Sequence, residues 1–342
     1  MHIAVIGAGS WGTAITAVLG QKHHSVRLWV RSPELSRQIQ VSRENANYLP
    51  GCKLPQSVLI TPDLKEAAAG ASLIVLATPS HAVRQTVAKL SSYVSPETIL
   101  VNVAKGLELS SLKRLSETIV EELPAIANQI AILSGPNHAE EVALAYPTAT
   151  VVAAKSRKVA EYIQDAFMQP YFRVYTNPDI IGVELAGALK NIIALGAGIA
   201  DGLGFGDNAK SALMTRGLAE IARLGISMGA NPLTFAGLAG IGDLIATCTS
   251  SHSRNRRAGL MLASGKSVNE IQTETSMVVE GIRATKAAYQ LAVKQGIDMP
   301  ITNQIYQVLY QNKSPKDAVF ELMTRSRTHE VEEVALHNSS WD

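Results

Sequence analysis

The chain has 342 residues, of which 46% are apolar and 18% charged, a composition typical of globular rather than disordered proteins. Its length favours two domains, and a net charge of +2 excludes a general polyanion binder, so no nucleic-acid partner is expected. The first residues begin a strand pattern without a secretory signal, and the longest uncharged run, Leu224 to Gly242, is interrupted by glycines and Pro232. We therefore expect a cytoplasmic protein without a membrane span. Cys52 and Cys248 lack metal-ligand spacing, so no metal site is predicted.

The first half of the chain alternates short β-branched runs with polar helical stretches. This pattern is typical of parallel strands joined by crossover helices, and it predicts an α/β domain with a doubly wound Rossmann-type sheet in residues 1–178. The expected strands are residues 3–6, 26–30, 73–77, 99–103, 130–133 and 150–153. Sheets of this kind bind ligands at the carboxyl ends of their strands, so the loops after these runs are candidate site segments.

From about Pro178 the strand pattern ends and helical patterns follow. The predicted helices are residues 179–200, 208–225, 254–264, 280–295 and 301–310. We expect an all-helical domain over residues 179–327 and a polar tail over residues 328–342 that frays. The first of these helices holds several glycines, each of which costs up to about 1 kcal/mol relative to alanine unless close packing offsets it. That helix is therefore expected to be central and tightly packed.

A glycine-rich segment, Gly7 to Gly12, matches the pattern GxGxxG between the first strand and a helix. Gly7 would allow a tight turn, Gly9 would let the backbone approach a pyrophosphate, and Gly12 would let the helix pack on the sheet. This context predicts binding of NAD or NADP, with the anion at the helix N-terminus. Within the motif, Trp11 is either a cofactor contact or a partly buried aromatic under the loop.

The second strand ends at Val30 and is followed by Arg31, where an acidic residue usually binds the adenosine ribose. An arginine at this position can face a 2′-phosphate, so we expect good binding of NADP(H). The alternative is that Arg31 is merely solvated.

Two lysines and one acid are the candidates for catalysis. Lys190 lies beside Asn191 on a predicted helix of small and apolar residues, and burial would lower the pKa of its ammonium toward the range useful for proton exchange. Asp243 follows a glycine-rich apolar stretch and could orient this lysine. Lys105 follows the fourth predicted strand and could extend into the cleft. The alternatives are a Lys190 whose charged end reaches water and a solvated Lys105.

A polar and basic segment, Ser253 to Arg257, opens another predicted helix. Backbone N–H groups, a hydroxyl, an amide and a guanidinium are expected to converge there on one small volume, which suits a phosphate dianion. A basic surface patch is the alternative.

Together these segments resemble the NAD(P)-dependent glycerol-3-phosphate dehydrogenase family in its bacterial form, over nearly the whole chain. The most specific segments are residues 7–12, 104–106, 134–136, 184–191, 201–208, 242–248, 253–256 and 278–281. The resemblance implies reversible reduction of dihydroxyacetone phosphate to sn-glycerol 3-phosphate by NADH or NADPH for phospholipid synthesis. It also implies a helical domain like the C-terminal domain of 6-phosphogluconate dehydrogenase, and a homodimer formed through that domain.

The resemblance also implies roles for individual residues. Lys190 would be the proton donor and acceptor, with Lys105 and Asp243 beside it. The implied substrate-binding residues are Lys105, Gly135, Asn137, Lys190, Asn191, Asp243, Thr247, Ser253, Arg254 and Asn255. The implied cofactor-binding residues are Gly7, Gly9, Ser10, Trp11, Gly12, Arg31, Lys105, Ala139, Arg254, Val278 and Glu280. The chain departs from the family at Asn137 and His138, where members commonly have Ser and then Phe after the proline. Asn137 can still form hydrogen bonds, whereas His138 replaces an apolar side chain.

Two other hypotheses remain open. A β-hydroxyacid or 6-phosphogluconate-type dehydrogenase shares the architecture, but those families place an asparagine one turn after the lysine, where this chain has Ala194. A nucleotide-binding sensor could keep a Rossmann fold without turnover. Such a sensor would not need Lys190, Asp243 or the pair Arg254 and Asn255.

Overall fold

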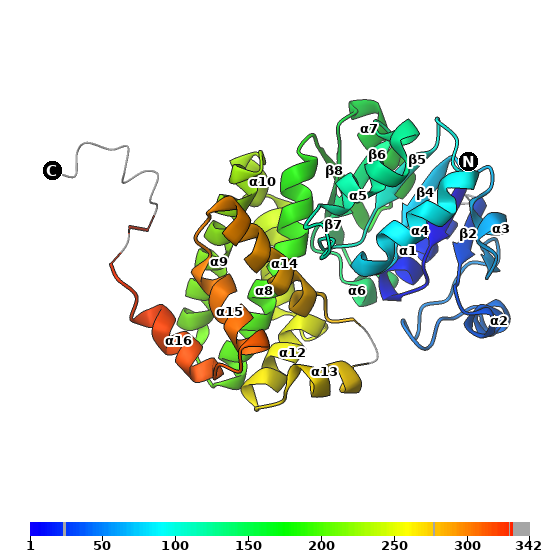
Figure 1. Cartoon of the computed structure of the whole chain (residues 1–342). Coiled ribbons are helices and arrows are strands. Elements are labelled where there is room, and N and C mark those ends of the chain that lie inside the picture. Colours follow the sequence, from blue (N-terminus) through cyan, green and yellow to red (C-terminus); the bar gives the residue numbers. More distant parts are fainter. Residues whose placement is uncertain (23–24, 276–277, 328, 331–342) are drawn as a thin grey trace.

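The computed structural model describes residues 1–22, 25–275, 278–327 and 329–330. Most of the predicted polar tail, residues 328–342, therefore lies outside the described residues. Figure 1 shows a sheet-containing half, coloured blue to green, beside a helical half, coloured green to orange. The last strand ends at Asn177 and the next helix begins at Ile180, so the change from strands to helices falls where the sequence predicts it.

Eight strands form one sheet within the described residues, in the order β3-β2-β1-β4-β5-β6-β7-β8. Their bounds are β1 His2–Ile6, β2 Ser25–Trp29, β3 Leu59–Thr61, β4 Leu73–Leu76, β5 Ile99–Asn102, β6 Ile130–Ser134, β7 Thr148–Ala154 and β8 Phe172–Asn177. All six predicted strands are present, whereas β3 and β8 were not predicted. Strands β1 to β6 pair in parallel, β7 is antiparallel to β6, and β8 is parallel to β7.

Helices cover both faces of this sheet because alternate strand residues point to opposite sides. Ile3 and Val5 of β1 belong to the core under α1 (Ser10–Gln21) and α7 (Arg157–Phe167), whereas Ala4 and Ile6 belong to the core under the helices of the other face. Those helices are α3 (Leu64–Ala68), α4 (Val83–Leu90) and α5 (Leu115–Glu122), while α2 (Pro33–Ser42) and α6 (Ala139–Ala143) complete this half. The arrangement is the predicted doubly wound sheet.

The helical half is built around α8 (Ile180–Gly202), which is buried along almost its whole length. The helices around it are α9 Asp207–Ser227, α10 Pro232–Phe235, α11 Asp243–Thr249, α12 Arg254–Ala263, α13 Val268–Glu274, α14 Glu280–Gln295, α15 Pro300–Tyr310 and α16 Pro315–Met323. The expectation of a central, tightly packed helix is thus confirmed. Helices α10, α11, α13 and α16 were not predicted.

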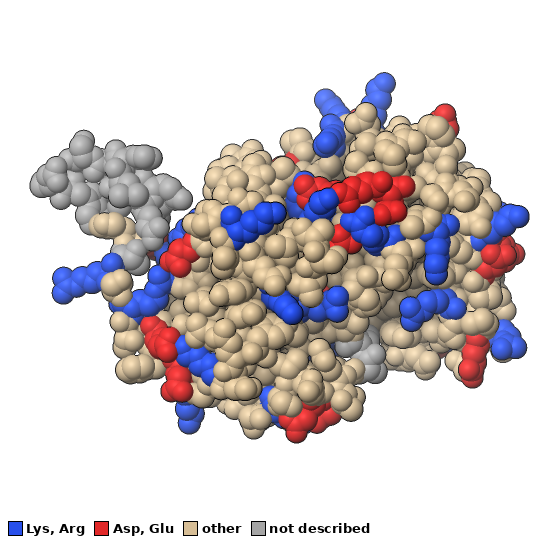
Figure 2. Space-filling view, in the orientation of Figure 1, with Lys and Arg blue, Asp and Glu red and all other residues tan. Residues whose placement is uncertain are grey.

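Two helical stretches are long and apolar enough to cross a membrane by length and composition alone. The first is α8, whose apolar window is 94% buried, as the central helix of a helical core must be. The second, residues 232–249, contains α10, a π-helical turn with non-helical backbone at Gly240, and α11, so it is not one continuous helix. On the face shown in Figure 2, the described Lys and Arg side chains lie in small groups among acidic and uncharged ones.

Candidate active site

The glycine-rich turn joins β1 to α1 at the carboxyl edge of the sheet. Gly7 has φ +119°, and a Cβ there would lie 2.7 Å from the carbonyl oxygen of Ala77. A Cβ on Gly12 would lie 2.0 Å from the carbonyl oxygen of Gly7, so both positions require glycine. At Gly9, the N-cap of α1, a Cβ would meet no atom within 4 Å, so the space beside that backbone is open. This cradle fits the pyrophosphate of a dinucleotide at a helix N-terminus.

The other predicted cofactor residues near this turn have mixed surroundings. Ser10 Oγ donates to the carbonyl oxygen of Tyr48 at 2.6 Å. Trp11 is half-buried against the core, with its ring centroid 6.4 Å from that of Phe172, and its buried indole N–H has no acceptor among the described residues. Trp11 thus packs on the core under the loop, and its contact with the cofactor stays a prediction. Arg31 is exposed just beyond β2, so its guanidinium can reach solvent or a ligand.

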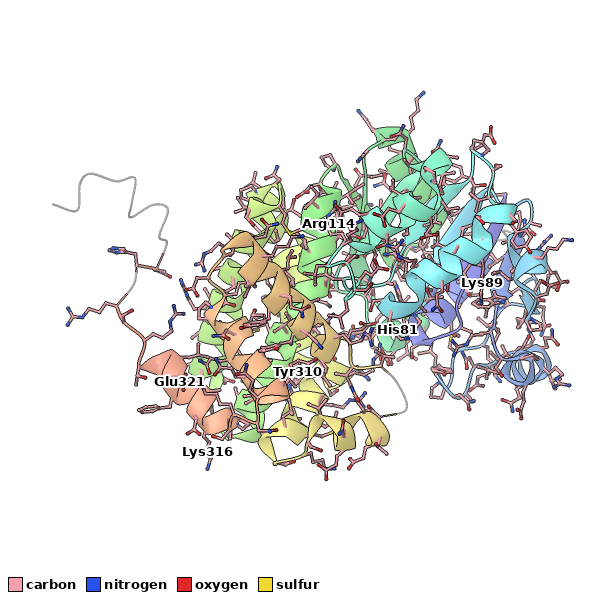
Figure 3. All side chains as sticks on the ribbon, in the orientation of Figure 1. His81, Lys89, Arg114, Tyr310, Lys316 and Glu321 are labelled. Carbon is pink, nitrogen blue, oxygen red and sulfur yellow. The ribbon has the colours of Figure 1, made fainter. Side chains whose placement is uncertain are left out.

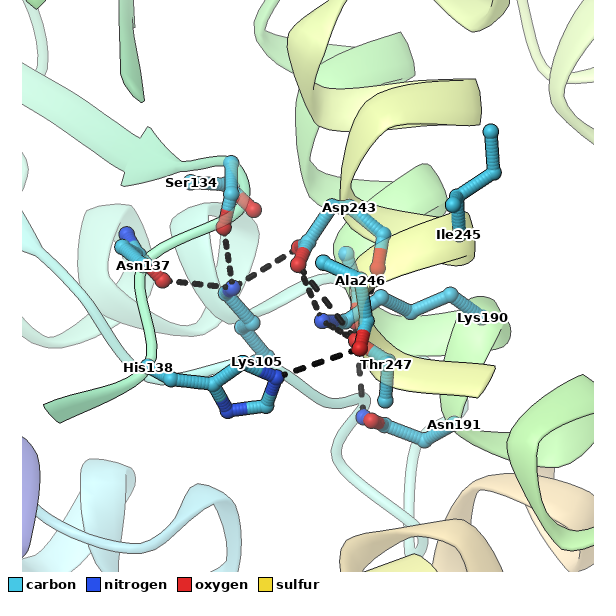
Figure 4. Close-up of polar contacts among 12 residues, drawn as sticks. Lys105, Ser134, Asn137, His138, Lys190, Asn191, Asp243, Ile245, Ala246 and Thr247 are labelled. Carbon is cyan, nitrogen blue, oxygen red and sulfur yellow. Dashed lines mark hydrogen bonds and ion pairs between the residues drawn. The ribbon is translucent and has the colours of Figure 1, made fainter. Parts of the chain in front are cut away.

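Lys190 is buried on α8, with 5% of its surface exposed. Its ammonium donates to Asp243 Oδ1 and to Thr247 Oγ1, both on α11, as Figure 4 shows. Burial lowers the pKa of Lys190 to about 7, although the Asp243 carboxylate acts in the opposite direction and Lys105 adds to the lowering. The alternative in which the charged end of this lysine reaches water does not hold.

Lys105 lies on the other side of the same carboxylate. Its ammonium donates to Asp243 Oδ2 at 2.7 Å, to the carbonyl oxygen of Gly135 at 3.0 Å and to Asn137 Oδ1 at 3.0 Å (Figure 4). Burial alone would raise the pKa of Asp243, but the two ammonium groups outweigh it and hold that pKa below its usual value. The structure thus brings Lys105, Asp243 and Lys190 together as one charged cluster.

The backbone before Asp243 explains how an acid from a glycine-rich stretch reaches this cluster. Residues 238–242 form a π-helical turn in which Gly240 has φ −88° and ψ −105°. A Cβ on Gly240 would lie 2.0 Å from the carbonyl oxygen of Phe235, so the turn can close only with glycine at that position. Helix α11 then starts at Asp243 and carries Thr247 one turn later, where the Thr247 hydroxyl donates to the Asp243 carbonyl oxygen at 2.7 Å.

Residues 253–256 each make a contact of their own at the start of α12, and their convergence on a phosphate stays a prediction. Ser253 Oγ caps α12 by accepting from the Arg256 backbone, and Arg254 donates to the carbonyl oxygen of Val278 at 3.3 Å. Asn255 donates to Asn191 Oδ1 at 2.8 Å, whereas the Arg256 guanidinium binds Asp201. Arg254 and Arg256 are two residues apart and leave the helix in directions about 200° apart, because one turn holds 3.6 residues, so Arg256 lies on another side of α12 from Arg254.

Two contacts that the sequence did not predict join the halves near the site. Glu280, expected at the cofactor, accepts from the Ser80 backbone at 3.2 Å and from Ser80 Oγ at 2.7 Å. Ser80 neighbours His81, which Figure 3 places where the two halves face each other.

The remaining predicted cofactor residues lie at the starts of two helices. Ala139 is the buried first residue of α6, and Val278 lies two residues before α14.

The second unpredicted contact is a buried clamp at Glu184, six residues before Lys190 on α8. Its carboxylate accepts from the Ser116 backbone at 2.7 Å, from Ser116 Oγ at 2.6 Å and from Arg114 at 3.1 Å. Figure 3 shows Arg114 at the junction of the halves. Burial raises the pKa of Glu184 despite Arg114. The loop that begins with Lys105 is therefore anchored at its far end to the helix that carries Lys190.

A hollow of about 360 Å³ adjoins the charged cluster. It is lined by Pro136, His138, Glu141, Ala246, Thr249, Ser250, Ser251 and His252. His138 Nε2 lies 3.3 Å from the carbonyl oxygen of Ala246, and burial, with help from Lys190, lowers the pKa of its imidazole. A neutral His138 can occupy a position beside two ammonium groups without adding a third positive charge.

A Rossmann-type sheet with a dinucleotide cradle, next to a buried lysine of lowered pKa, defines a nicotinamide-dependent dehydrogenase. Models of the NAD-dependent glycerol-3-phosphate dehydrogenase N-terminus and C-terminus match residues 2–160 and 179–320. The chain therefore belongs to this family and is an NAD(P)-dependent oxidoreductase.

Individual relatives agree with the family models. The glycerol-3-phosphate dehydrogenase (NAD(P)+) of Moorella thermoacetica is 58% identical over 330 residues, covering 96% of this chain and 98% of that protein. The protein of the same name from Pelotomaculum thermopropionicum is 56% identical, covering 98% of this chain and 96% of that protein. The crystal structure of glycerol-3-phosphate dehydrogenase from Coxiella burnetii superposes with a TM-score of 0.91 at 38% identity, covering 95% of this chain and 99% of that one.

Proposed function

We propose that this chain catalyses the reversible reduction of dihydroxyacetone phosphate to sn-glycerol 3-phosphate with NADH or NADPH, as a step toward glycerophospholipids. The observation that carries the proposal is the buried Lys190 ammonium, with a pKa of about 7, on a carboxylate shared with Lys105. Names of the relatives give the substrate, and the dinucleotide cradle at Gly7 and Gly12 fits the cofactor.

When bound, the nicotinamide would supply the hydride for C2 of the ketone. Lys190 gives its proton to the oxygen that becomes an alkoxide, and the positive charge of Lys105 helps to offset the charge on that oxygen. Asp243 orients both ammonium groups through one carboxylate oxygen each. In the reverse direction neutral Lys190 accepts the proton. A pKa of about 7 leaves both forms populated at neutral pH, as a residue serving both directions requires.

The substrate is proposed to lie between the charged cluster and the start of α12. Arg254 is the proposed phosphate ligand, because its guanidinium is accessible at the N-terminus of a ten-residue helix with no acidic residue in its first turn. The remaining proposed substrate ligands are Gly135, Asn137, Asn191, Thr247, Ser253 and Asn255. Asn255 supports this placement because it contacts Asn191, the neighbour of Lys190.

The cofactor is proposed to extend from the glycine-rich turn toward the cluster. Its proposed ligands are Gly7, Gly9, Ser10, Trp11, Gly12, Arg31, Lys105, Ala139, Arg254, Val278 and Glu280. The Arg31→Ala variant should weaken NADPH binding more than NADH binding if the guanidinium faces the 2′-phosphate. An unchanged ratio of the two dissociation constants would remove Arg31 from this set.

The organisation of the protein is also a proposal. Residues 1–178 would form the cofactor domain and residues 179–327 the helical substrate domain. We propose that two copies associate through the helical domains and that the protein acts in the cytoplasm.

The proposal is tested by following the near-ultraviolet absorbance of reduced nicotinamide with dihydroxyacetone phosphate as substrate. Lys190→Ala should lower kcat by on the order of a thousandfold with little change in cofactor affinity, since it removes the proton donor. Arg254→Ala should mainly raise the substrate KM. Near-normal turnover in Lys190→Ala would exclude this lysine as the acid. A wild-type chain that binds the cofactor but turns over no ketone phosphate would instead support the sensor hypothesis.

A further inference from the structure

The start of α12 is held against α8 by direct backbone contact. A Cβ on Gly198 would lie 1.9 Å from the carbonyl oxygen of Arg256, and a Cβ on Gly259 would lie 2.1 Å from that of Leu195. Two glycines thus let the helices approach closely, which fixes their separation. The rotation of the first turn of α12 about the helix axis is then determined by the contacts of its side chains.

Two of those side chains hold that rotation from different sides. Asn255 donates to Asn191 Oδ1 and accepts from the Gly281 backbone at 2.8 Å. Next to it, the Arg256 guanidinium donates to Asp201 Oδ2 through Nε at 2.7 Å and makes a second contact at 2.6 Å. Asp201 lies in the last turn of α8, so this contact ties α12 to the end of that helix.

The Asp201 and Arg256 pair is shielded enough to matter energetically. The side chains are 12% and 23% exposed, and Lys210 approaches the other oxygen of Asp201 at 3.2 Å. A charge-assisted contact that is largely out of water contributes more than an exposed ion pair. Segment 201–208, one of the family-specific segments, lies outside the charged cluster at Lys190. Its first residue, Asp201, instead binds Arg256 on α12, the helix proposed to bind the substrate.

Arg254 has weaker contacts with the protein than Asn255 and Arg256 have. Its guanidinium donates to the carbonyl oxygen of Val278 at 3.3 Å, a long hydrogen bond, and its side chain is accessible. The direction in which its side chain leaves the helix is set by the turn on which it sits, since residues 254, 255 and 256 share one helical turn. Fixing residues 255 and 256 aims residue 254.

We propose that Asp201 and Arg256 are positioning residues that determine affinity for the phosphate group of the substrate, through the orientation of Arg254. The inference rests on the proposed function, in which Arg254 binds that phosphate. Neither residue touches the reacting atoms, so both act on substrate binding and leave the proton-transfer step at Lys190 in place.

The test uses Arg256→Lys, which keeps the charge but loses the planar fork, and Asp201→Asn, which keeps the shape but loses the charge. Each should raise the KM for dihydroxyacetone phosphate and the competitive inhibition constant of inorganic phosphate by roughly tenfold, with kcat changed less than twofold. Arg157→Lys, in the exposed pair of Arg157 and Glu161 on α7, is the matched control and should change neither constant.

If the two residues were merely structural, their variants would lower kcat together with substrate affinity, or would lower the thermal midpoint of unfolding without changing the phosphate inhibition constant. Either result overturns the inference. A double variant gives a second check, which compares the effect of Asp201→Asn on the KM in two backgrounds and so does not rely on the stability of a single variant. In the Arg254→Ala background, Asp201→Asn should add little to the KM, because the side chain that it aims is gone. Fully additive effects would contradict the proposal.

The same series separates this inference from the proposed function. If Arg254→Ala leaves the KM unchanged, the phosphate role of Arg254 fails and the function proposed for α12 fails with it. If Arg254→Ala raises the KM but Arg256→Lys and Asp201→Asn do not, only the positioning role is refuted.

Discussion

Replacing Asp243 by asparagine should move the pH dependence of the reaction, because Asp243 is the carboxylate that Lys190 and Lys105 share. Asparagine keeps the size of the side chain but removes its charge. Burial already lowers the pKa of Lys190 to about 7, and Asp243 is the main group that opposes this lowering. Without the carboxylate the ammonium form of Lys190 loses its counter-charge, so its pKa must fall further.

The size of the fall follows from the contact. Opposite charges about 4 Å apart attract by about 4 kcal/mol at an effective dielectric constant of about 20, equivalent to at most about 3 pKa units. A fall of about two units would lower the protonated fraction of Lys190 at pH 7 from about one half to about 1%. A more acidic ammonium gives up its proton more readily and recovers part of this loss. We therefore expect kcat/KM for reduction at pH 7 to fall by on the order of tenfold.

The assay is kcat/KM in both directions from about pH 5 to about pH 9, with Asp298→Asn, in an exposed ion pair with Arg325, as the control. Reduction needs protonated Lys190, so its rate falls as pH rises through the pKa, and that midpoint should move from about 7 toward about 5 in Asp243→Asn. Both directions share one equilibrium constant, so oxidation should fall by the same factor at each pH if cofactor affinity is unchanged. An unmoved midpoint with a lower rate would refute the electrostatic role.

Three further substitutions test the framework around the site. Gly198→Ala should destabilise the protein by about 3 kcal/mol in chemical unfolding, because its Cβ would meet the Arg256 carbonyl. Gly206→Ala, whose Cβ meets open space, should cost far less, and equal costs would contradict the close packing. Glu220 is buried on α9, where its carboxylate accepts from the Ile301 backbone at the start of α15, and burial raises its pKa from 4.5 to about 7. Stability should therefore fall as pH rises from about 4.5 through about 7, and Glu220→Gln should remove up to about 3 kcal/mol of that dependence; an unchanged slope would be evidence against it. Glu184→Gln should lower stability by about 3 kcal/mol and should also lower kcat. Glu117 is the exposed partner of Arg114, and Glu117→Gln should change neither quantity appreciably.

The sequence predicted the sheet well where strands are buried on both faces. Every residue of β4 is buried, so its continuous apolar run is unambiguous. By contrast, β3 has only three residues, and in β8 buried Phe172 and Val174 alternate with exposed Arg173 and Tyr175. The two edge strands therefore lacked the apolar run used to identify the others, although the alternation in β8 was a usable signal. The antiparallel direction of β7 has no signature in a single apolar run.

Within the candidate site, the sequence identified the residues whose chemistry conflicts with their surroundings. Lys190 stands out because an ammonium in an apolar helix needs a partner, and Asp243, its expected partner, is in contact with it. Contacts between distant segments could not be found in this way. Ser80 and Glu280 are 200 positions apart, and neither is unusual where it lies. That Arg256 leaves the helix on another side from Arg254, however, follows from helix geometry and could have been predicted.

The reversed direction of β7 and β8 has a consequence for protein engineering. Because β8 runs opposite to β1 through β6, α8 starts at the far edge of the sheet and passes along β6 before Lys190 reaches the site, about 15 Å further on. Only Pro178 and Asp179 join β8 to α8, and Asp179 caps the helix while also accepting from Asn231 and Thr234. A chimera joined at this point would disrupt the Asp179 contacts that hold the start of α8 to residues 231 and 234. Recombined enzymes should therefore inherit the sheet edge and α8 from the same parent.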